Sequence, residues 1–327
     1  MSLNRTFSVA PMMEYTDRHF RYLVRLMSRH TLLFTEMVTA QAIIHGDRQK
    51  LLGYDALEHP IVAQLGGSDP KQLAEAAQVA EDFGYDEVNL NVGCPSARVQ
   101  SGCFGVSLMH HPALVAECIA AMKHRVRIPV TVKSRIGVDD NDSYEALCHF
   151  VQQLRSVDCD ALYVHARKAW LEGLSPKENR SIPPLNYPMV YQLKQDFPSL
   201  PMIINGGVKT LAETQTHLTQ MDGVMVGREI YANPGLFCAL DQTLFADPTP
   251  VISRHEVLAQ YLPYIASQLS QGVPLKHISR HVLGLFRGIP GGKRWRRYVS
   301  ENAFKAEADV SLIEHAMVAL QPSHTHY

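Results

Sequence analysis

The sequence predicts an α/β protein, a TIM (β/α)8 barrel followed by a small all-α helical bundle. Short β-rich runs alternate eight times with amphipathic helical segments over about 245 residues, the size typical of such a barrel. The strand runs are nearly continuous apolar stretches, as expected for parallel strands covered on both faces. No strand pattern follows Pro248 and Pro250, which read as a linker. We therefore expect a barrel domain at residues 1–246 and a helical domain at residues 251–327.

Each barrel unit combines one expected strand with the helical segment that follows it. The strands are expected at residues 7–12, 32–38, 61–65, 87–91, 130–134, 161–165, 202–205 and 223–226. The helices are expected at residues 17–29, 40–49, 70–83, 112–125, 142–156, 187–197, 211–220 and 233–245. Asp69 and Thr210 directly precede two of these helices, and short polar side chains of this kind cap helix N-termini.

The C-terminal region has helical periodicity alone. Helices are expected at residues 254–270, 276–287, 293–305 and 311–320. Ser253 stands three residues before Glu256, which is the spacing of a capping box. Consecutive helices without strands predict a small bundle.

Charge is unevenly distributed along the 327 residues. The whole chain holds 31 Lys and Arg against 32 Asp and Glu, yet from residue 251 onward the counts are nine against five. No acidic residue lies between Val257 and Ser300. This asymmetry indicates an anionic polymer as a partner. In the cluster Lys293-Arg294-Trp295-Arg296-Arg297 we favour phosphate contact; the alternative is a solvated helix face with Trp295 in the bundle core.

The cysteines and the apolar runs limit the class of protein. The six cysteines form no Cys-x-x-Cys pair and no zinc-type spacing, so we expect free thiols, no disulfide framework and no structural metal. No apolar run approaches the roughly 18 residues of a membrane helix, and the N-terminus lacks a secretory signal pattern. These features predict a cytoplasmic protein without a membrane partner.

Cys94 follows the fourth expected strand in a position suited to chemistry. Val88 and Leu90 alternate with Asn89 and Asn91, so the polar side chains share one face of this strand and point toward a site. A glycine before Cys94 allows a turn, and a proline after it fixes the chain. A thiol at neutral pH is mostly protonated, so it can donate a proton as well as act as a nucleophile. The alternative is an ordinary buried core cysteine.

The loops after the seventh and eighth strands carry paired phosphate-binding signals. Asn205-Gly206-Gly207 follows the seventh strand and Gly227-Arg228 follows the eighth. In TIM barrels these two loops commonly bind phosphate, because backbone amides at glycine turns can face an anion. Either turn alone would be a weak signal, since glycine after a strand usually marks only a turn.

Polar residues also end the other strands, and together they suit flavin mononucleotide (FMN). Gln64 can bind the edge of the isoalloxazine through its amide, and Lys133 can lie beside the N1 and C2 carbonyl side, where negative charge grows on reduction. Cys94 would then face the substrate and protonate the carbon next to a carbonyl after hydride addition. For Gln64, Lys133 and His165 the alternatives are a loop hydrogen bond, a snorkelling lysine and a hydrogen-bonded core histidine.

The motifs resemble those of the tRNA-dihydrouridine synthases. The matching runs are Ala10-Pro11-Met12, Gln64-Leu65-Gly66-Gly67, Asn89-Leu90-Asn91-Val92-Gly93-Cys94-Pro95, Val132-Lys133-Ser134-Arg135, Val164-His165-Ala166-Arg167, Asn205-Gly206-Gly207 and Gly227-Arg228. The runs closest to the type A bacterial branch are Thr35-Glu36-Met37-Val38-Thr39, His165-Ala166-Arg167-Lys168-Ala169-Trp170, Leu174-Ser175-Pro176-Lys177-Glu178-Asn179-Arg180 and Gly288-Ile289-Pro290-Gly291. The resemblance spans essentially the whole chain.

The resemblance implies a flavoenzyme that acts on tRNA. It implies bound FMN, NADPH as reductant, hydride transfer from flavin N5 to C6 of D-loop uridines at positions 20 and 20a, and proton donation from Cys94 to C5. It assigns FMN binding to Pro11, Met12, Met13, Gln64, Lys133, His165, Asn205, Gly206, Gly207, Gly227 and Arg228. It assigns tRNA binding to Asn91, Lys177, Arg180, Lys293 and Arg296. Residues 1–246 would thus be the FMN-binding catalytic domain and residues 251–327 the tRNA-binding domain of a monomer.

Two other functions remain open on the sequence. The first is a flavin enzyme acting on a free pyrimidine, similar to dihydroorotate dehydrogenase, which would leave the basic helical domain without a role. The second is a non-catalytic RNA-binding protein on a barrel scaffold.

Overall fold

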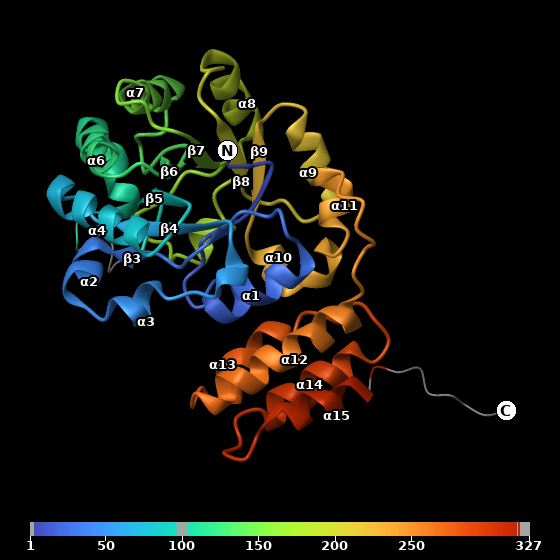
Figure 1. Cartoon of the computed structure of the whole chain (residues 1–327). Coiled ribbons are helices and arrows are strands. Elements are labelled where there is room, and N and C mark those ends of the chain that lie inside the picture. The colour runs from blue at the N-terminus through green and yellow to red at the C-terminus, as the bar shows by residue number, and fades with distance from the viewer. Residues whose placement is uncertain (1–2, 97–101, 103, 319, 321–327) are drawn as a thin grey trace. The chain divides into compact units, whose positions relative to one another are not determined.

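The computed structural model of the chain describes residues 3–96, 102, 104–318 and 320. Within them, one nine-stranded sheet follows the order β1-β9-β8-β7-β6-β5-β4-β2, with β3 also paired to β4, and every pairing is parallel. The strands are β1 (Phe7–Val9), β2 (Leu33–Phe34), β3 (Val38–Thr39), β4 (Ile61–Gly66), β5 (Glu87–Val92), β6 (Val130–Arg135), β7 (Leu162–His165), β8 (Met202–Asn205) and β9 (Gly223–Val226). A parallel bridge between Ser8 and Leu32 closes the ring, which confirms the predicted barrel (Figure 1).

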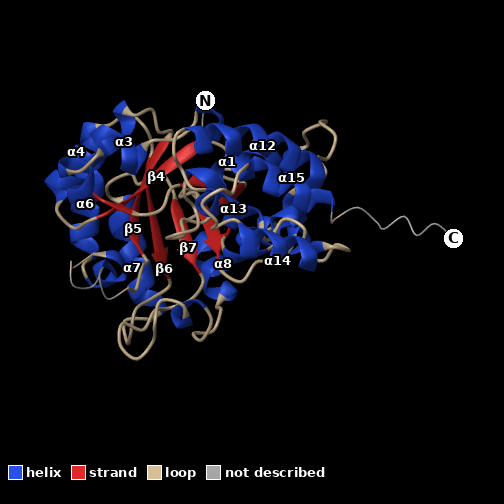
Figure 2. Ribbon diagram, turned by 90° about the horizontal axis from the view of Figure 1, so that it is seen from below, coloured by secondary structure: helices blue, strands red, loops and turns tan. Residues whose placement is uncertain are grey.

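Helices surround this barrel, as Figure 2 shows for α4, α6, α7 and α8. The α-helices between the strands are α2 (Ala40–His45), α3 (Arg48–Leu52), α4 (Pro70–Asp82), α6 (Pro112–Arg125), α7 (Tyr144–Arg155), α8 (Tyr187–Asp196) and α9 (Leu211–Leu218). Short 3-10 turns are η1 (Ala56–Glu58), η2 (Gly105–His110) and η3 (Glu178–Arg180). The expected caps are confirmed, since Asp69 accepts from the Gln72 amide and Thr210 forms a capping box with Glu213.

Three predicted elements in this region differ from the structure. The first strand ends at Val9 because the Met12 carbonyl accepts from the amides of Tyr15 and Thr16, which starts a turn. The second strand is divided into β2 and β3 because the Thr35 hydroxyl, rather than a carbonyl, accepts from the Gln64 amide. The helix expected at 40–49 is divided into α2 and α3 by Gly46 and Asp47.

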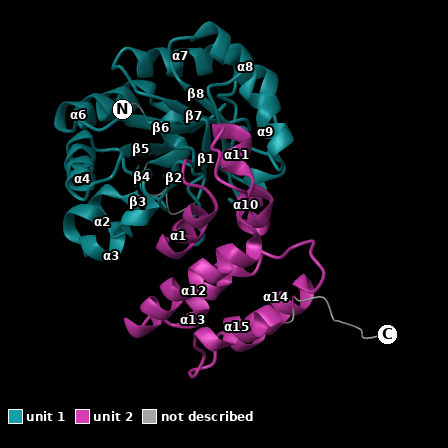
Figure 3. Cartoon of the chain, turned by 45° about the vertical axis from the view of Figure 1, so that its right-hand side comes forward, with its two compact units in different colours: residues 1–16, 31–227 teal, residues 17–30, 228–327 magenta. Residues whose placement is uncertain are grey.

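Close packing divides the chain into two compact units (Figure 3). The first contains residues 1–16 and 31–227, and the second contains residues 17–30 and 228–327. The first helix after β1 and the segment after β9, both within the expected barrel domain, therefore belong to the second unit. Aromatic packing accounts for this, because Tyr22 stacks on Tyr264 at 4.0 Å and Phe20 contacts Tyr231 at 5.0 Å between ring centroids.

The second unit consists of helices and 3-10 turns in the part of it that the structure describes. They are α1 (Arg18–Met27), α10 (Arg228–Ala232), η4 (Pro234–Phe237), α11 (Leu240–Phe245), α12 (Arg254–Ser270), α13 (Leu275–Ser279), η5 (Arg280–Val282), α14 (Gly292–Asn302) and α15 (Val310–Val318). The Ser253–Glu256 capping box is confirmed. The helix expected at 233–245 is instead η4 and α11, and the one expected at 276–287 is shortened to α13 and η5. No helix in the described ranges has the length and apolar character needed to cross a bilayer.

Candidate active site

Cys94 lies in a loop that the side chain of Asn91 holds in place. The Asn91 Oδ1 atom accepts from the backbone amide of Gly93 at 3.1 Å and from that of Cys94 at 2.9 Å. The Cys94 carbonyl in turn accepts from the Val106 amide at 3.0 Å. Cys94 is half-buried, unlike the fully buried Cys118 and Cys159, so the alternative of an ordinary core cysteine does not describe it.

Arg135 fixes the same loop from the next strand. Its Nε donates to the Gly93 carbonyl at 2.9 Å, while its Nη1 donates to the carbonyls of Lys168 and Asn179 at 3.1 and 3.0 Å. Burial, together with the charges of Arg180 and Arg167, lowers the pKa of Arg135 to about 10, and a negative charge on Cys94 acts in the opposite direction. A guanidinium still charged at neutral pH therefore ties the loop before Cys94 to the segment that follows β7.

Gln64 and Asn91 form part of a buried row of amides inside the barrel. Asn91 Nδ2 donates to Gln64 Oε1 at 2.9 Å, and Gln64 Nε2 donates to Asn89 Oδ1 at 2.9 Å. All three side chains are at least nine-tenths buried. The predicted alternation along the fourth strand is thereby confirmed, since Asn89 and Asn91 share the interior face. Gln64 hydrogen-bonds to these strand residues, which answers the alternative of a loop hydrogen bond.

Lys133 is a half-buried cation on the interior face of β6. Its Nζ donates to Asn205 Oδ1 at 3.1 Å, and Asn205 Nδ2 donates to the Met225 carbonyl at 2.8 Å. Burial, with a smaller contribution from the charge of Arg135, lowers the pKa of Lys133 to about 7, and a negative charge on Cys94 acts in the opposite direction. The Lys133 ammonium group is thus bound to Asn205 of β8, and an added anion would offset the desolvation of this cation.

The seventh strand ends in a turn that only glycine fits. Gly206 and Gly207 have φ angles of +116° and +78°. A Cβ on Gly206 would lie 2.7 Å from His165 Cδ2, and one on Gly207 would lie 2.5 Å from Leu185 Cδ1. The Gly206 carbonyl accepts from the Tyr187 hydroxyl at 2.6 Å. The chain is thus held close to His165, which ends β7.

The remaining predicted cofactor residues occupy the first and last barrel loops. Met12 is buried in the turn after β1, Pro11 is half-buried, and Met13 is 55% exposed. Gly227 directly follows β9, and a Cβ there would lie 3.5 Å from the Ala10 side chain and 3.6 Å from the Met12 sulfur. Arg228 is the first residue of α10 and belongs to the second compact unit.

The predicted tRNA-binding residues lie on both units. In the first unit, Lys177 is exposed and Arg180 is half-buried at η3. In the second unit, Lys293 and Arg296 are exposed on α14. Trp295 is fully buried and donates from Nε1 to the Val282 carbonyl at 3.1 Å. Trp295 therefore lies in the core, as the alternative of a solvated helix face required, and the basic residues beside it are exposed. Phosphate contact by these basic residues stays a prediction.

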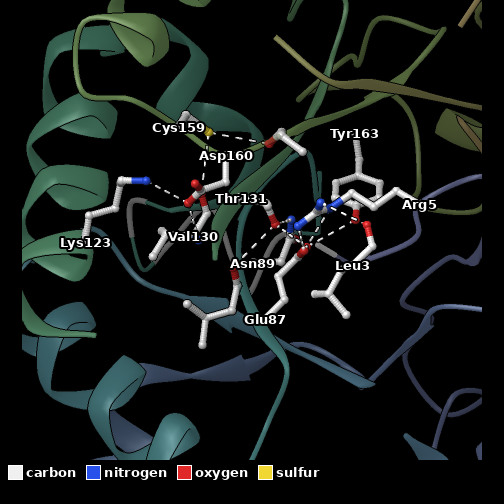
Figure 4. Close-up of polar contacts among 12 residues, drawn as sticks. Leu3, Arg5, Glu87, Asn89, Lys123, Val130, Thr131, Cys159, Asp160 and Tyr163 are labelled. Carbon is white, nitrogen blue, oxygen red and sulfur yellow. Dashed lines mark hydrogen bonds and ion pairs between the residues drawn. The ribbon is translucent and has the colours of Figure 1, made fainter. Parts of the chain in front are cut away.

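The sequence analysis did not identify the buried residues that hydrogen-bond to the amide row inside the barrel. Glu87 on β5 accepts from the hydroxyls of Thr131 and Tyr163 and pairs with Arg5, as Figure 4 shows. Thr131 in turn accepts from Asn89. Period-2 alternation places Glu87 on the same strand face as Asn89, but nothing local in the sequence reveals the partners on other strands.

One group of possible metal ligands occurs in the described residues, in the second unit. His30, Asp241 and Asp247 bring ligand atoms within 4.8 Å of one another. Asp241 already accepts from the Ser28 hydroxyl and the Arg29 amide, and Asp247 accepts from His30. These bonds account for the cluster without an ion. Cys94, Cys118, Cys148, Cys159 and Cys238 carry free thiols as expected, and Cys103 lies outside the described residues.

Comparison with known proteins gives concordant matches. A family model described as dihydrouridine synthase matches residues 8–321. A protein of Escherichia coli K12 named tRNA-dihydrouridine(20/20a) synthase is 59% identical over 95% of this chain and 90% of its own. Proteins of the same name from Yersinia pestis and Shewanella oneidensis are each 56% identical, over 97% and 98% of this chain and 92% and 95% of their own.

Proposed function

Because the chain belongs to the dihydrouridine synthase family, we propose that it reduces the C5=C6 bond of D-loop uridines in tRNA, at positions 20 and 20a, to 5,6-dihydrouridine. The observation that carries this proposal is the arrangement around Cys94. The backbone of the loop that carries this half-buried thiol is held by Asn91 and Arg135 beside a buried, polar barrel interior. This is the geometry that proton donation to a bound base requires.

The cofactor proposed is FMN, and the chemistry of the residues fits it. Gln64 offers N–H donors in a buried setting and Lys133 in a half-buried one, and a nearby negative charge would favour the charged form of Lys133. Gly206 and Gly207 let the backbone after β8 approach His165 closely, at positions where any side chain would collide with its neighbours. The remaining residues that we propose to bind FMN are Pro11, Met12, Met13, His165, Asn205, Gly227 and Arg228. When bound, FMN supplies the hydride that adds to C6 of the uracil, and we propose NADPH as the reductant.

Cys94 is proposed as the acid that protonates C5 of the uracil. The backbone amides of Gly93 and Cys94 both donate to Asn91, which restricts the position of this loop, so the thiol needs little reorganisation to act. Asn91 also keeps one amide hydrogen outside its bond to Gln64, and we assign it to the target nucleotide.

Basic residues on both units are proposed to hold the tRNA. Lys177, Arg180, Lys293 and Arg296 would bind backbone phosphates. A uridine must leave the folded D-loop to reach a buried site, which costs a few kcal/mol that phosphate contacts can offset. We propose that the protein acts in this way as a cytoplasmic monomer.

The experiment is incubation of the purified protein with FMN, NADPH and unmodified tRNA, followed by mapping of dihydrouridine. Parallel reactions contain free uracil or dihydroorotate. The proposal expects a yellow protein that forms dihydrouridine at positions 20 and 20a and leaves the free pyrimidines unchanged. Turnover of free pyrimidine at the rate seen with tRNA would favour the dihydroorotate-dehydrogenase-like alternative. A colourless protein that binds tRNA but no added FMN would favour the non-catalytic one.

A further inference from the structure

A continuous chain of hydrogen bonds runs through the barrel interior from Cys94 to Glu87. The backbone amide of Cys94 donates to Asn91 Oδ1, and Asn91 Nδ2 donates to Gln64 Oε1, both at 2.9 Å. Gln64 Nε2 donates to Asn89 Oδ1 at 2.9 Å. Asn89 Nδ2 then donates to Thr131 Oγ1 at 3.0 Å, and Thr131 Oγ1 donates to Glu87 Oε1 at 2.6 Å. Figure 4 shows the end of this chain at Asn89, Thr131 and Glu87.

The groups at both ends of this hydrogen-bond chain require the same direction of donation along it. At one end the backbone amides of Gly93 and Cys94 can only donate, so Asn91 must present its oxygen to them. At the other end a carboxylate can only accept, so Thr131 must donate to Glu87 and accept from Asn89. The Val88 carbonyl competes weakly for the Thr131 hydrogen, because it lies at 3.4 Å rather than 2.6 Å.

Glu87 is held as an acceptor by its surroundings. Its Oε2 accepts from Arg5 through Nε at 3.0 Å and also through Nη2. Its Oε1 accepts from Tyr163 at 3.1 Å in addition to Thr131. Burial raises the pKa of Tyr163 well above its usual value, which keeps the phenol a donor. Burial also raises the pKa of Glu87, an effect that the charge of Arg5 and the hydrogen bonds from Thr131, Arg5 and Tyr163 oppose. With these four donors around it, the fully buried carboxylate is satisfied as an ion paired with Arg5.

The direction of donation along the hydrogen-bond chain decides which atoms the side-chain amides of Gln64 and Asn91 can offer to a ligand. Turning over the amide of Gln64 would set its nitrogen against Asn91 Nδ2 and its oxygen against Asn89 Oδ1. Two favourable contacts would thereby become two repulsive ones in a buried site. The N–H hydrogens of Gln64 and Asn91 that lie outside the chain therefore have one fixed position each.

We propose that Glu87, Thr131 and Asn89 are positioning residues that fix the amide orientation of Gln64 and Asn91 for the flavin and the target base. None of the three needs to touch either ligand. The inference rests on the proposed function, since the two amides are assigned there to FMN and to the nucleotide.

The test compares two substitutions of Thr131 with a control on the same strand. Thr131→Val replaces the hydroxyl by a methyl group of similar size, and Thr131→Ser restores a hydroxyl. Ser134→Ala is the control, because the Ser134 hydroxyl is buried in β6 and makes no hydrogen bond to the described residues. For each variant we would measure the unfolding midpoint without cofactor, the FMN dissociation constant, the flavin visible spectrum and the single-turnover rate at saturating tRNA.

The expected result is FMN binding about tenfold weaker in Thr131→Val, with a shifted flavin spectrum and a slower single turnover. Thr131→Ser should restore all three, and Ser134→Ala should keep the wild-type values. A Thr131→Val protein with wild-type FMN affinity and spectrum, or a Thr131→Ser protein no better than it, would overturn the inference. Failure of the proposed function looks different, because the wild-type protein itself would then bind no FMN or form no dihydrouridine.

A second variant covers the case in which Thr131→Val does not fold. Asn89→Asp keeps the shape of the side chain, but its carboxyl group can donate to Thr131 only while it is protonated. We expect the FMN affinity of this variant to fall relative to wild type as pH rises and the new carboxyl group ionises. An affinity ratio that stays constant from pH 5 to pH 8 would contradict the proposed direction of the chain.

Discussion

The barrel interior and helix α14 use polar residues in opposite ways. Gln64, Asn91 and Asn205 are buried and hydrogen-bonded in fixed directions. On α14, by contrast, Lys293 and Arg296 are exposed around the buried Trp295. Chemistry at a single bond requires fixed geometry, whereas attraction to a phosphate backbone is a sum over many weakly placed charges. Substitutions in the first region should therefore change rates strongly, and those in the second should change affinity modestly and in a salt-dependent way.

The largest effect is expected for Cys94→Ala. Loss of a general acid slows catalysis by roughly 10²–10⁴-fold, so dihydrouridine formation should fall by that factor. FMN affinity and tRNA affinity should stay at wild-type values, because the loop is held through the backbone amide of residue 94 and the Asn91 side chain. Single-turnover assays with saturating tRNA measure the rate, and unchanged turnover would remove Cys94 from the proposed role.

The next largest effect is expected for Gly206→Ala. The positive φ angle of +116° and the close approach to His165 both oppose a side chain there. Backbone strain of this kind costs about 1–3 kcal/mol, and the collision should add to it and weaken FMN binding. Thermal unfolding and FMN titration provide the measurements.

Gly173→Ala is the matched control for this glycine. Gly173 also has a positive φ, +77°, but a Cβ added there would have no described atom within 4 Å beyond its chain neighbours. The Gly173→Ala variant should lose stability through backbone strain alone and keep the wild-type FMN affinity. If the two variants bind FMN equally well, the Gly206 turn is not part of the cofactor site.

A smaller effect with a defined pH dependence is expected for Lys133. Its pKa is lowered by burial to about 7, while an unfolded lysine titrates near 10.4. Between these values the unfolded chain binds more protons than the folded one, so stability rises with pH. We therefore compare the free energy of unfolding of the wild type and of Lys133→Met, both without FMN. From pH 7 to pH 9 the difference should shift in favour of the wild type by up to about 1 kcal/mol per pH unit.

Chemical unfolding at several pH values measures this difference. The exposed Lys71 on α4 serves as the control, because it is solvated in the folded and the unfolded chain alike. Lys71→Met should therefore show no such trend. A stability difference for Lys133→Met that is constant with pH would mean that the lysine is not desolvated by folding.

The smallest effect is expected for Arg296→Ala. Loss of one phosphate contact should weaken tRNA binding a few-fold and reduce the slope of log affinity against log salt by about one. Arg297→Ala is the control on the same helix, since Arg297 is bound to Glu301 at 2.8 Å and should contribute less. Binding measured over a salt series checks both variants, and an unchanged slope for Arg296→Ala would mean that this residue contacts no phosphate.

The sequence was sufficient for the barrel and for the residues at its strand ends. Apolar strand runs located most strands, and the alternation of Asn89 and Asn91 with apolar neighbours correctly predicted their shared interior face. Contacts between strands could not be predicted, because register decides them. The pairing of Asn89 with Thr131 and of Lys133 with Asn205 depends on residues 42 and 72 positions apart.

The division of the chain into compact units was also beyond the sequence. The linker at Pro248 and Pro250 suggested a boundary there, but α1 and α10 pack with the C-terminal helices through aromatic rings such as Phe20 and Tyr231. A stacked ring pair between distant helices leaves no local signal. The observed strand boundaries also differ from the predicted ones where a side chain, rather than a backbone carbonyl, accepts a backbone hydrogen bond. The Thr35 hydroxyl accepts from the Gln64 amide in this way.

The separation between a rate-determining interior and an affinity-determining helix is tested most directly by the double variant Cys94→Ala/Arg296→Ala. Its tRNA dissociation constant and its single-turnover rate at saturating tRNA are measured beside those of the two single variants. The account predicts the rate of Cys94→Ala together with the dissociation constant of Arg296→Ala, with no coupling between the two changes. A single-turnover rate lowered at saturation by Arg296→Ala alone, or a tRNA affinity altered by Cys94→Ala alone, would contradict it.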